Sequence, residues 1–185
     1  EVAAKNREMG LYSKELFDEF ISRTNEHLAK FSRNLRLEKI SKELDQRTTF
    51  YLQLDDNRVT FDEKIQGHEF RYTLSEGDKS TLAISLFLAK ISFASKPENL
   101  IVIFDDPLTS LDSGRRFLTI KELSKLADKI GQLVVLTHDS TFAADLEREM
   151  RVPNLSLERA YKNKESWLTK RSHHEQNATG LFRDL

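Results

Sequence analysis

The feature that most constrains the fold is an unbroken run of five apolar residues that ends in two carboxylates. Residues 100–104 read Leu-Ile-Val-Ile-Phe, and Asp105 and Asp106 follow directly. An apolar run without alternation is typical of a strand covered on both faces, hence of a central strand in a parallel sheet. Side chains at the carboxyl end of such a strand face the crevice where α/β folds bind ligands. The two carboxylates are therefore candidate binding or catalytic residues, although Asp-Asp-Pro is also a good turn signal.

Helical and strand patterns alternate around this run. Residues 77–94 are apolar on nearly every face of a helix, which is typical of a buried helix. A second helix is expected over residues 113–130, a short buried strand over 132–136, and a third helix over 140–150. This order predicts an α/β fold with right-handed crossovers and a mostly parallel sheet flanked by helices.

The amino-terminal part has a different character. Residues 1–46 contain no Pro and show apolar residues at helical spacing, which predicts a helical arm of one or two amphipathic helices. Residues 48–54 favour β-structure, and the turn signal at 55–57 precedes a second short β-favouring run. We expect an antiparallel pair there, with residues 69–73 as a candidate extension.

These patterns divide the chain into three expected parts. Residues 1–46 form the helical arm, residues 47–150 form the α/β lobe, and residues 151–185 form a terminal strand and a loose tail. A chain of 185 residues is long enough for one sizeable core. The first residue is not Met, so a fragment, a processed chain and an unseen start all remain open.

Composition excludes some classes of function. The chain has 29 Lys plus Arg and 30 Asp plus Glu, so any nucleic-acid contact would have to come from a local patch. The absence of Cys excludes disulfides and Cys-based metal sites and fits a reducing cytoplasm. The longest apolar stretch, around residues 82–93, is too short and too polar to span a bilayer, and no signal peptide is visible. We therefore expect a cytoplasmic protein with no membrane partner.

A second candidate segment, residues 74–79, reads Leu-Ser-Glu-Gly-Asp-Lys and precedes the buried helix. Ser75 is a good N-cap, and Asp78 three residues later loosely suits a capping box. Free backbone N–H groups, a glycine and a hydroxyl at a helix start also form an anion site. The segment thus admits a structural and a ligand-binding interpretation.

Two further segments complete the pattern. Residues 110–112 read Ser-Leu-Asp, which alone is only a helix cap. His138 follows the second buried strand and is expected at the same sheet edge as Asp105 and Asp106, where an imidazole can donate a hydrogen bond to a phosphate. We expect these three side chains and the helix start at Ser75 to share one rim of the sheet.

Taken in chain order, the segments at 74–79, 100–106, 110–112 and 134–139 resemble the signature motif, Walker B, D-loop and H-loop of ABC ATPases. Ser75 lies 30 residues before Asp105, and His138 lies 33 residues after it. The form Phe-Asp-Asp-Pro-x-x-Ser-Leu-Asp, with Leu-Ser-Glu-Gly-Asp-Lys upstream and Leu-Thr-His-Asp downstream, is similar to AAA ATPases of the RloC and PrrC anticodon-nuclease type. It resembles SMC and RecN heads more loosely. The resemblance covers roughly residues 70–145 and implies the carboxy-terminal lobe of an ABC-type head.

The resemblance implies ATP and Mg²⁺ as cofactors and a dimer of heads as the working form. Asp105 would bind Mg²⁺, Asp106 would be the catalytic carboxylate, and His138 would sense the γ-phosphate. Many ABC proteins have Glu where this chain has Asp106. The residues implied to contact ATP held by a partner head are Ser75, Gly77, Lys79 and Asp112. In such heads the amino-terminal helix is often the returning arm of a coiled coil, so residues 1–46 are a candidate root.

The sequence contains no Walker A loop of the form Gly-x-x-x-x-Gly-Lys-Ser/Thr. Lys79-Ser80 does not qualify, because Asp78 and Thr73 stand where the two glycines belong. We therefore expect an amino-terminal lobe, in the same protein or another chain, to supply the loop. DNA repair, chromosome maintenance and phage defence are all compatible processes, with DNA or RNA as a compatible partner.

Two other functions remain open at this point. One is a metal-dependent nuclease or phosphatase, whose metal ligands would be Asp105, Asp106, His138 and Asp139, with His173-His174 as further candidates. That alternative leaves the segments at 74–79 and 110–112 without a role. A non-catalytic interaction module is the other possibility, and the intact acidic pair argues against it.

Overall fold

The computed structural model describes residues 2–41, 48–61, 68–107, 112–152, 155–160 and 165–170. The chain divides into two compact units. The first comprises residues 1–99 and 108–118, and the second comprises residues 100–107 and 119–185. Each unit is described by itself below.

The first unit combines a long helix with a small sheet and a second helix that is buried on part of its surface. Its described elements are α1 (Val2–Phe31), β1 (Leu35–Ser41), β2 (Thr48–Leu54), β3 (Asn57–Thr60), β4 (His68–Glu69), α2 (Phe70–Thr73), α3 (Glu76–Ile91) and the short 3₁₀ helix η1 (Pro97–Asn99). The described strands pair in the order β1-β2-β3-β4, antiparallel except for the parallel pair β3–β4. The expected antiparallel pair over residues 48–61 is confirmed.

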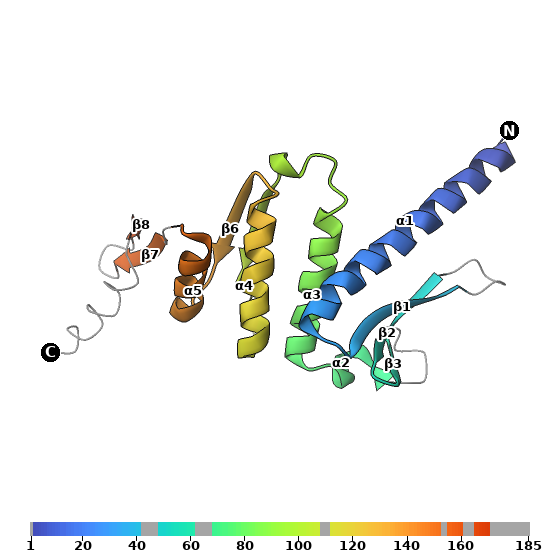
Figure 1. Ribbon diagram of the computed structural model, residues 1–185, viewed down its shortest axis with the longest axis horizontal. Coiled ribbons are helices and arrows are strands. Elements are labelled where there is room, and N and C mark those ends of the chain that lie inside the picture. Colours follow the sequence, from blue (N-terminus) through green and yellow to red (C-terminus); the bar gives the residue numbers. More distant parts are fainter. Residues whose placement is uncertain are drawn as a thin grey trace. The chain divides into compact units, whose positions relative to one another are not determined.

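The core of this unit lies where α1, the sheet and α3 meet. Its buried residues are aliphatic, and burying each such side chain contributes about 1.5–3 kcal/mol. They are Leu28, Leu35, Leu37, Leu52, Val59, Leu74 and Leu82. α1 packs against α3 and against β1 (Figure 1). Leu74 belongs to this core, so the segment that precedes α3 is anchored in it.

The helical prediction for residues 1–46 is wrong in its last part. α1 ends at Phe31, and β1 begins at Leu35. The reason is a local change of period: Leu35 and Leu37 are buried, whereas Arg36 between them is exposed, as alternation in a strand requires. The candidate extension at residues 69–73 is likewise helical from Phe70 onward, because α2 starts there.

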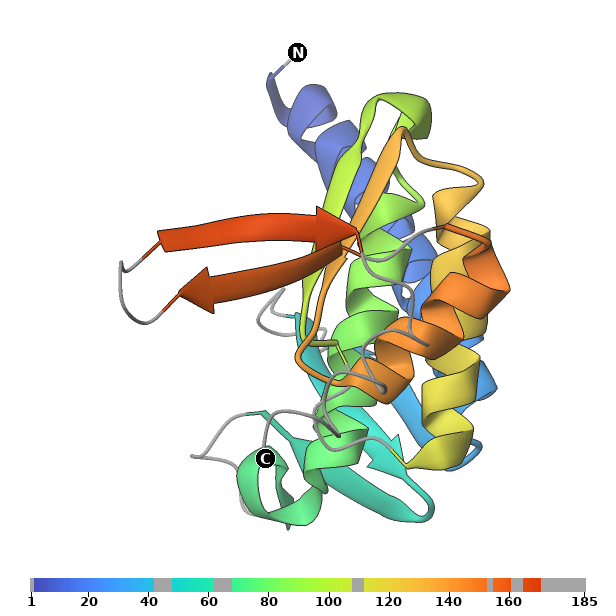
Figure 2. The ribbon, with the colours of Figure 1, turned by 90° about the vertical axis from the view of Figure 1, so that its left-hand side faces the viewer.

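The second unit contains the predicted parallel pair. Its strands β5 (Ile101–Asp105) and β6 (Gln132–Leu136) run parallel, in register from Ile101 opposite Gln132 to Asp105 opposite Leu136 (Figure 2). Helix α4 (Ser113–Ala127), which begins in the first unit, connects them, and α5 (Ser140–Met150) follows. The α/β fold class is thereby confirmed.

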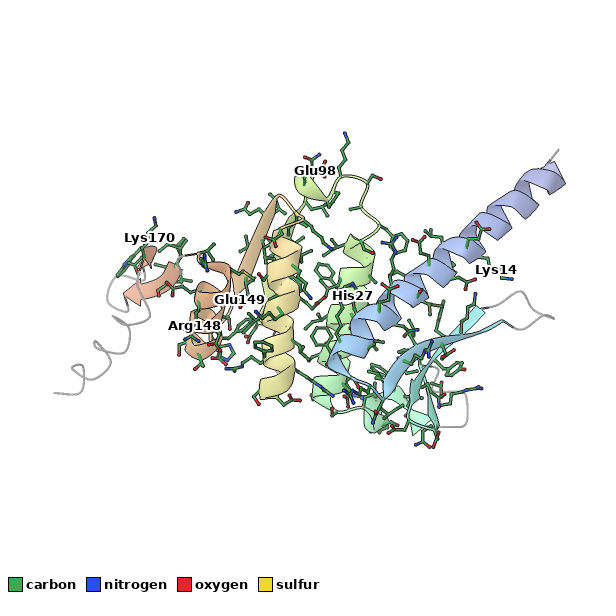
Figure 3. The ribbon with its side chains drawn as sticks, in the orientation of Figure 1. Lys14, His27, Glu98, Arg148, Glu149 and Lys170 are labelled. Carbon is green, nitrogen blue, oxygen red and sulfur yellow. The ribbon has the colours of Figure 1, made fainter. Side chains whose placement is uncertain are left out.

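A second pair of strands follows α5. β7 (Leu155–Ala160) and β8 (Glu165–Lys170) form an antiparallel hairpin, of which only β7 was expected from the sequence (Figure 2). Within the same unit, Glu149 on α5 accepts hydrogen bonds from Lys121 on α4 at both oxygens, 2.7 and 2.9 Å from Nζ (Figure 3). This ion pair joins α4 to α5.

The expectation that the first parallel strand is covered on both faces is wrong for the described residues. Val102 and Phe104 are buried, but Ile101 and Ile103 are 66% and 59% exposed. The described part of the sheet has β6 as the only partner of β5, and Leu136 on β6 is also exposed. One face of the pair therefore presents apolar side chains to solvent, which is unusual for a parallel sheet.

No helix among the described residues is long and apolar enough to cross a membrane. The expected loose tail lies mostly at residues 171–185, outside the described residues. The three-part division of the chain stays a prediction.

Candidate functional site

Asp106 and His138 come together at the carboxyl ends of the two parallel strands. Asp106 follows β5 directly, and His138 stands two residues beyond β6. His138 Nδ1 lies 2.6 Å from Asp106 Oδ2, within hydrogen-bond distance. The carboxylate is 27% exposed and the imidazole 83% exposed. The expected meeting of these two groups at one edge of the sheet is therefore found.

A second neighbour holds the other oxygen of the same carboxylate. Thr137 Oγ1 donates to Asp106 Oδ1 at 3.2 Å, and Thr137 Oγ1 in turn accepts the N–H of Asp139 at 3.1 Å. A carboxylate has about four lone-pair sites, so two bonds leave Asp106 able to accept from a water as well. Thr137 was not singled out from the sequence, since a threonine after a strand gives no distinctive signal.

The backbone of Asp106 is also unusual. Its φ of 47° lies in the left-handed region, which costs a non-glycine residue roughly 1–2 kcal/mol. The Asp106 N–H donates to the carbonyl of Leu136 at 2.8 Å, so the bond pattern of the sheet continues one residue past β5. This turn gives Asp105 and Asp106 different surroundings: Asp105 is exposed at the end of β5, and Asp106 is half-buried beside β6.

The segment at the start of α3, residues 74–79, forms the predicted capping box. Ser75 is the N-cap, and its Oγ accepts the N–H of Asp78 at 3.1 Å. The same hydroxyl donates to Asp78 Oδ2 at 2.6 Å. The N-cap role of Ser75, expected from the sequence, is thus found, and the side chains of Ser75 and Asp78 are bonded to each other.

The other two candidate residues of this segment are less accessible. Gly77 is buried within α3. Lys79 donates from Nζ to the carbonyl of Arg71 at 3.2 Å and to Glu76 Oε1 at 2.7 Å. The ammonium is therefore held within its own unit, and binding a phosphate would require it to leave Glu76.

Asp112 caps the helix that follows. Its Oδ1 accepts the N–H of Arg115 at 2.9 Å, as expected for the N-cap of α4. Arg115 also reaches α3: its Nη2 lies 2.7 Å from Asp78 Oδ1, and both side chains are about four-fifths buried, at 20% and 18% exposure. Burial by itself would raise the pKa of Asp78, but the hydrogen bonds from Ser75 and Arg115 and the Arg115 charge outweigh it and hold that pKa below 3.8.

The candidate residues thus gather in two clusters, each within one unit. One contains Asp106, Thr137 and His138, and the other contains Ser75, Asp78, Asp112 and Arg115. The sequence did not point to Arg115, because its bond to Asp78 joins residues 37 positions apart and no local pattern predicts such a bond.

The candidate metal ligands suit a Mg²⁺ ion that is shared with substrate phosphates better than they suit the two-metal site of a nuclease or phosphatase. Among the described residues, no group of three His, Cys, Asp or Glu side chains could hold a metal ion. Asp139 uses its carboxylate to cap α5, accepting the N–H groups of Thr141 and Phe142 at 2.9 and 3.0 Å. His173-His174 lies outside the described residues. Mg²⁺ commonly takes one or two carboxylates plus water and substrate phosphates, and the exposed Asp105 suits that role.

Comparison with known families decides the assignment. Residues 19–182 match the AAA_13 family, described as an AAA domain. The chain belongs to this family. Within curated proteins, this AAA domain is 33% identical over 66 residues to the DNA double-strand break repair Rad50 ATPase of Nanoarchaeum equitans (strain Kin4-M). That match spans 36% of the chain and only 8% of the relative.

Solved structures show the fold of the AAA domain. One, from work on ATP-driven dimerization and DNA stimulated activation of SMC ATPases, has a TM-score of 0.67 at 14% identity and covers 94% of this chain and 97% of its own. The Smc head domain with a coiled coil and joint from Pyrococcus yayanosii has a TM-score of 0.66 at 13% identity, covering 95% of this chain and 31% of its own. The chain therefore belongs to the AAA_13 family, and its fold is that of SMC head domains.

Proposed function

We propose that this AAA domain is the carboxy-terminal half of an ABC-type head that hydrolyses ATP between two dimerised heads. The observation that carries the proposal is the 2.6 Å contact between His138 Nδ1 and Asp106 Oδ2 at the carboxyl ends of adjacent parallel strands. Open α/β sheets bind ligands at that edge. Asp106 and His138 are then the catalytic residues, and Asp105 is the Mg²⁺ ligand.

In this proposal Asp106 orients the attacking water and accepts its proton, while His138 faces the γ-phosphate. Mg²⁺, when bound, neutralises charge on the phosphates. Asp106 is suited to its role because Thr137 and His138 fix the carboxylate in one orientation and leave lone pairs for a water. Its shorter side chain, compared with Glu, makes the distance to the γ-phosphate depend on this fixed orientation.

The capped start of α3 is proposed to act on ATP held by the partner head. Ser75, Gly77 and Lys79 then form the signature, and Asp112 belongs to the D-loop of the same interface. Support comes from Ser75, whose hydroxyl and N-cap position put a donor at a helix start, where the helix dipole favours anions. Dimerisation is part of this mechanism because neither head holds a complete site alone.

The Walker A loop is proposed to come from an amino-terminal lobe in the same protein or another chain. The exposed apolar face formed by Ile101, Ile103 and Leu136 supports this proposal. Parallel sheets are normally covered on both faces, and an additional lobe would bury these side chains.

For the process that the ATP cycle drives, we propose maintenance or repair of DNA. The Rad50 relative is a DNA double-strand break repair ATPase, and the SMC structure comes from work on DNA-stimulated activation. A DNA or RNA partner and a role in phage defence, which the likeness to RloC and PrrC implies, are finer proposals. The Pyrococcus furiosus Smc head binds the C-terminal domain of ScpA, and a partner of that kind is compatible here.

The test uses Asp106→Asn in the complete protein that contains this chain. The amide cannot accept the proton of the attacking water, so hydrolysis should slow by roughly 100-fold or more. ATP-driven dimers should persist, because Mg²⁺ and phosphate contacts are unchanged. Turnover is measured by phosphate release, and dimers by analytical ultracentrifugation. Hydrolysis at the parental rate would refute the assignment.

Asp128→Asn is the matched control. Asp128 is exposed, lies just beyond α4 in the same unit, and is remote in sequence from both strand ends. The Asp128→Asn variant should hydrolyse ATP at the parental rate. A second arm titrates the isolated 185-residue chain with Mg-ATP in a calorimeter. No measurable binding is expected, and tight binding would refute the half-site proposal.

A further inference from the structure

Arg115 connects two segments that come from different parts of the chain. Its Nη2 lies 2.7 Å from Asp78 Oδ1, at the start of α3. Its Nε lies 3.5 Å from Asp112 Oδ2, and its backbone N–H donates to Asp112 Oδ1 at 2.9 Å. All three residues belong to the first unit. One guanidinium therefore bridges the carboxylate that follows Ser75 and the carboxylate that caps α4.

The bridge extends to Ser75 through Asp78. Asp78 Oδ2 accepts the hydroxyl proton of Ser75 at 2.6 Å, while its Oδ1 is held by Arg115. The result is a continuous chain of contacts, Ser75–Asp78–Arg115–Asp112, in which the guanidinium is hydrogen-bonded to Asp78 and ion-paired with Asp112. A planar guanidinium holds its partners in a fixed geometry, which an ammonium does not.

The carboxylate of Asp78 presents an electrostatic difficulty for an anion site. A negative charge within hydrogen-bond distance of Ser75 opposes the approach of a phosphate to the same helix start. A serine hydroxyl also has only one proton, and here Ser75 gives it to Asp78. To donate to a phosphate, Ser75 must release Asp78, and a carboxylate that is four-fifths buried then needs another partner.

Arg115 meets both requirements. Its positive charge offsets that of Asp78, and its bond to Oδ1 remains when Oδ2 loses Ser75. We propose that Arg115 is a positioning residue that neutralises Asp78, frees Ser75 for the nucleotide, and fixes Ser75 and Asp112 relative to each other. This inference rests on the proposed function, since it concerns the two segments assigned to the partner's ATP.

The test compares four variants in the complete protein: Arg115→Met, Arg115→Lys, Asp78→Asn and the double variant Arg115→Met/Asp78→Asn. Met keeps the length of the side chain but not the charge, so Asp78 is left unneutralised. Hydrolysis at saturating Mg-ATP should then fall by roughly 10- to 100-fold, the worth of a charged hydrogen bond. Lys keeps the positive charge but not the planar set of donors, so the hydrolysis rate of Arg115→Lys should lie between those of the parent and Arg115→Met.

Rescue separates positioning from simple loss of structure. Adding Asp78→Asn to Arg115→Met removes the carboxylate that needs neutralising, so hydrolysis should recover to within about threefold of Asp78→Asn alone. A double variant as slow as Arg115→Met would overturn the proposal. Thermal unfolding of each variant is measured alongside, and a rate loss that follows melting temperature across the set would also overturn it.

Two references make the outcomes distinguishable. Arg33→Met, an exposed arginine in the same unit, should keep the parental rate. If Asp106→Asn abolishes hydrolysis while Arg115→Met does not change it, only the inference about Arg115 fails. If Asp106→Asn has no effect, the proposed function fails, and a double-mutant cycle of unfolding in the isolated chain still measures the coupling between Arg115 and Asp78.

Discussion

Oδ2 of Asp106 lies 2.6 Å from Nδ1 of His138, and the imidazole is by far the more exposed of the two groups. A carboxylate oxygen only accepts, so this short contact favours a proton on Nδ1 and one orientation of the ring. Nε2, on the opposite side of the ring, is then the nitrogen available to a ligand. The two residues therefore differ in role: neighbouring groups hold the Asp106 carboxylate, and the exposed His138 ring is the part of the pair that a ligand at the strand ends would meet.

The first prediction concerns His138→Ala in the complete protein. Removal of the imidazole should lower ATP hydrolysis by roughly 100-fold, which is the usual effect of losing one donor to a developing charge. Stability should change by less than about 1 kcal/mol, because the imidazole that is removed is 83% exposed. Turnover at saturating Mg-ATP and thermal unfolding measure the two effects. A large drop in melting temperature with unchanged turnover would show a structural role instead.

The second prediction follows from the left-handed backbone of Asp106. In the isolated chain, Asp106→Gly should be more stable than Asp106→Ala by roughly 1 kcal/mol, because glycine adopts positive φ without steric cost. Both variants lose the bonds to Thr137 and His138, so their difference isolates the backbone. Urea unfolding measures it. Asp128, which is not among the positive-φ residues, is the control, and there Ala should be the more stable replacement.

Features set by local sequence could be predicted, and features set by distant contacts could not. The parallel pairing of β5 and β6 and the helix caps at Ser75 and Asp112 follow from short apolar runs and from residues next to helix starts. The meeting of Asp106 with His138 follows from the rule that parallel strands end at one edge. These are the parts of the fold and site that one sequence determines.

Other features depend on what packs against a segment. Leu35 continues the helical spacing of Leu28, and the burial of Leu35 and Leu37 in the core with Leu52 goes with a strand instead. The exposed face of β5 was not expected, because an apolar run does not say how many neighbours a strand has. The bond between Arg115 and Asp78 joins positions 37 residues apart, beyond the reach of any local signal.

The third prediction concerns Asn25, which holds β1 against α1. Its amide donates to the carbonyl of Leu37 at 2.9 Å and accepts the Leu37 N–H at 2.8 Å. Asn25→Ala leaves both groups of a buried residue without these partners, so the free energy of unfolding should fall by roughly 2–4 kcal/mol. Asn25→Asp keeps the acceptor but sets an oxygen against the Leu37 carbonyl, and should be at least as damaging.

Urea unfolding of the isolated chain tests this prediction, with Asn34 as a control. Asn34 is exposed and lies between the end of α1 and the start of β1. Asn34→Ala should change stability by no more than about 0.5 kcal/mol. Equal effects at the two positions would show that the amide of Asn25 does not hold β1.

The last prediction uses the acid dependence of Asp78. Burial would raise its pKa, but hydrogen bonds from Ser75 and Arg115 and the Arg115 charge hold it below 3.8. A carboxylate with a depressed pKa stabilises the fold above its unfolded pKa, and that stability is lost as pH falls through the folded pKa. The parental chain should therefore be more stable than Asp78→Asn at pH 7 and pH 5, and the difference should shrink below about pH 4.

Comparing the two chains at each pH cancels the titration of carboxylates that they share, apart from Asp112, which contacts the same guanidinium. The comparison is therefore repeated in an Asp112→Asn background, where the stability difference between the chain with Asp78 and its Asp78→Asn variant should again shrink below about pH 4. Urea unfolding at pH 7, 5 and 3 supplies the free energies. A parental advantage that stays constant from pH 7 to pH 3 would mean that the charge of Asp78 contributes nothing, and the bond from Arg115 would then have to be explained by packing alone.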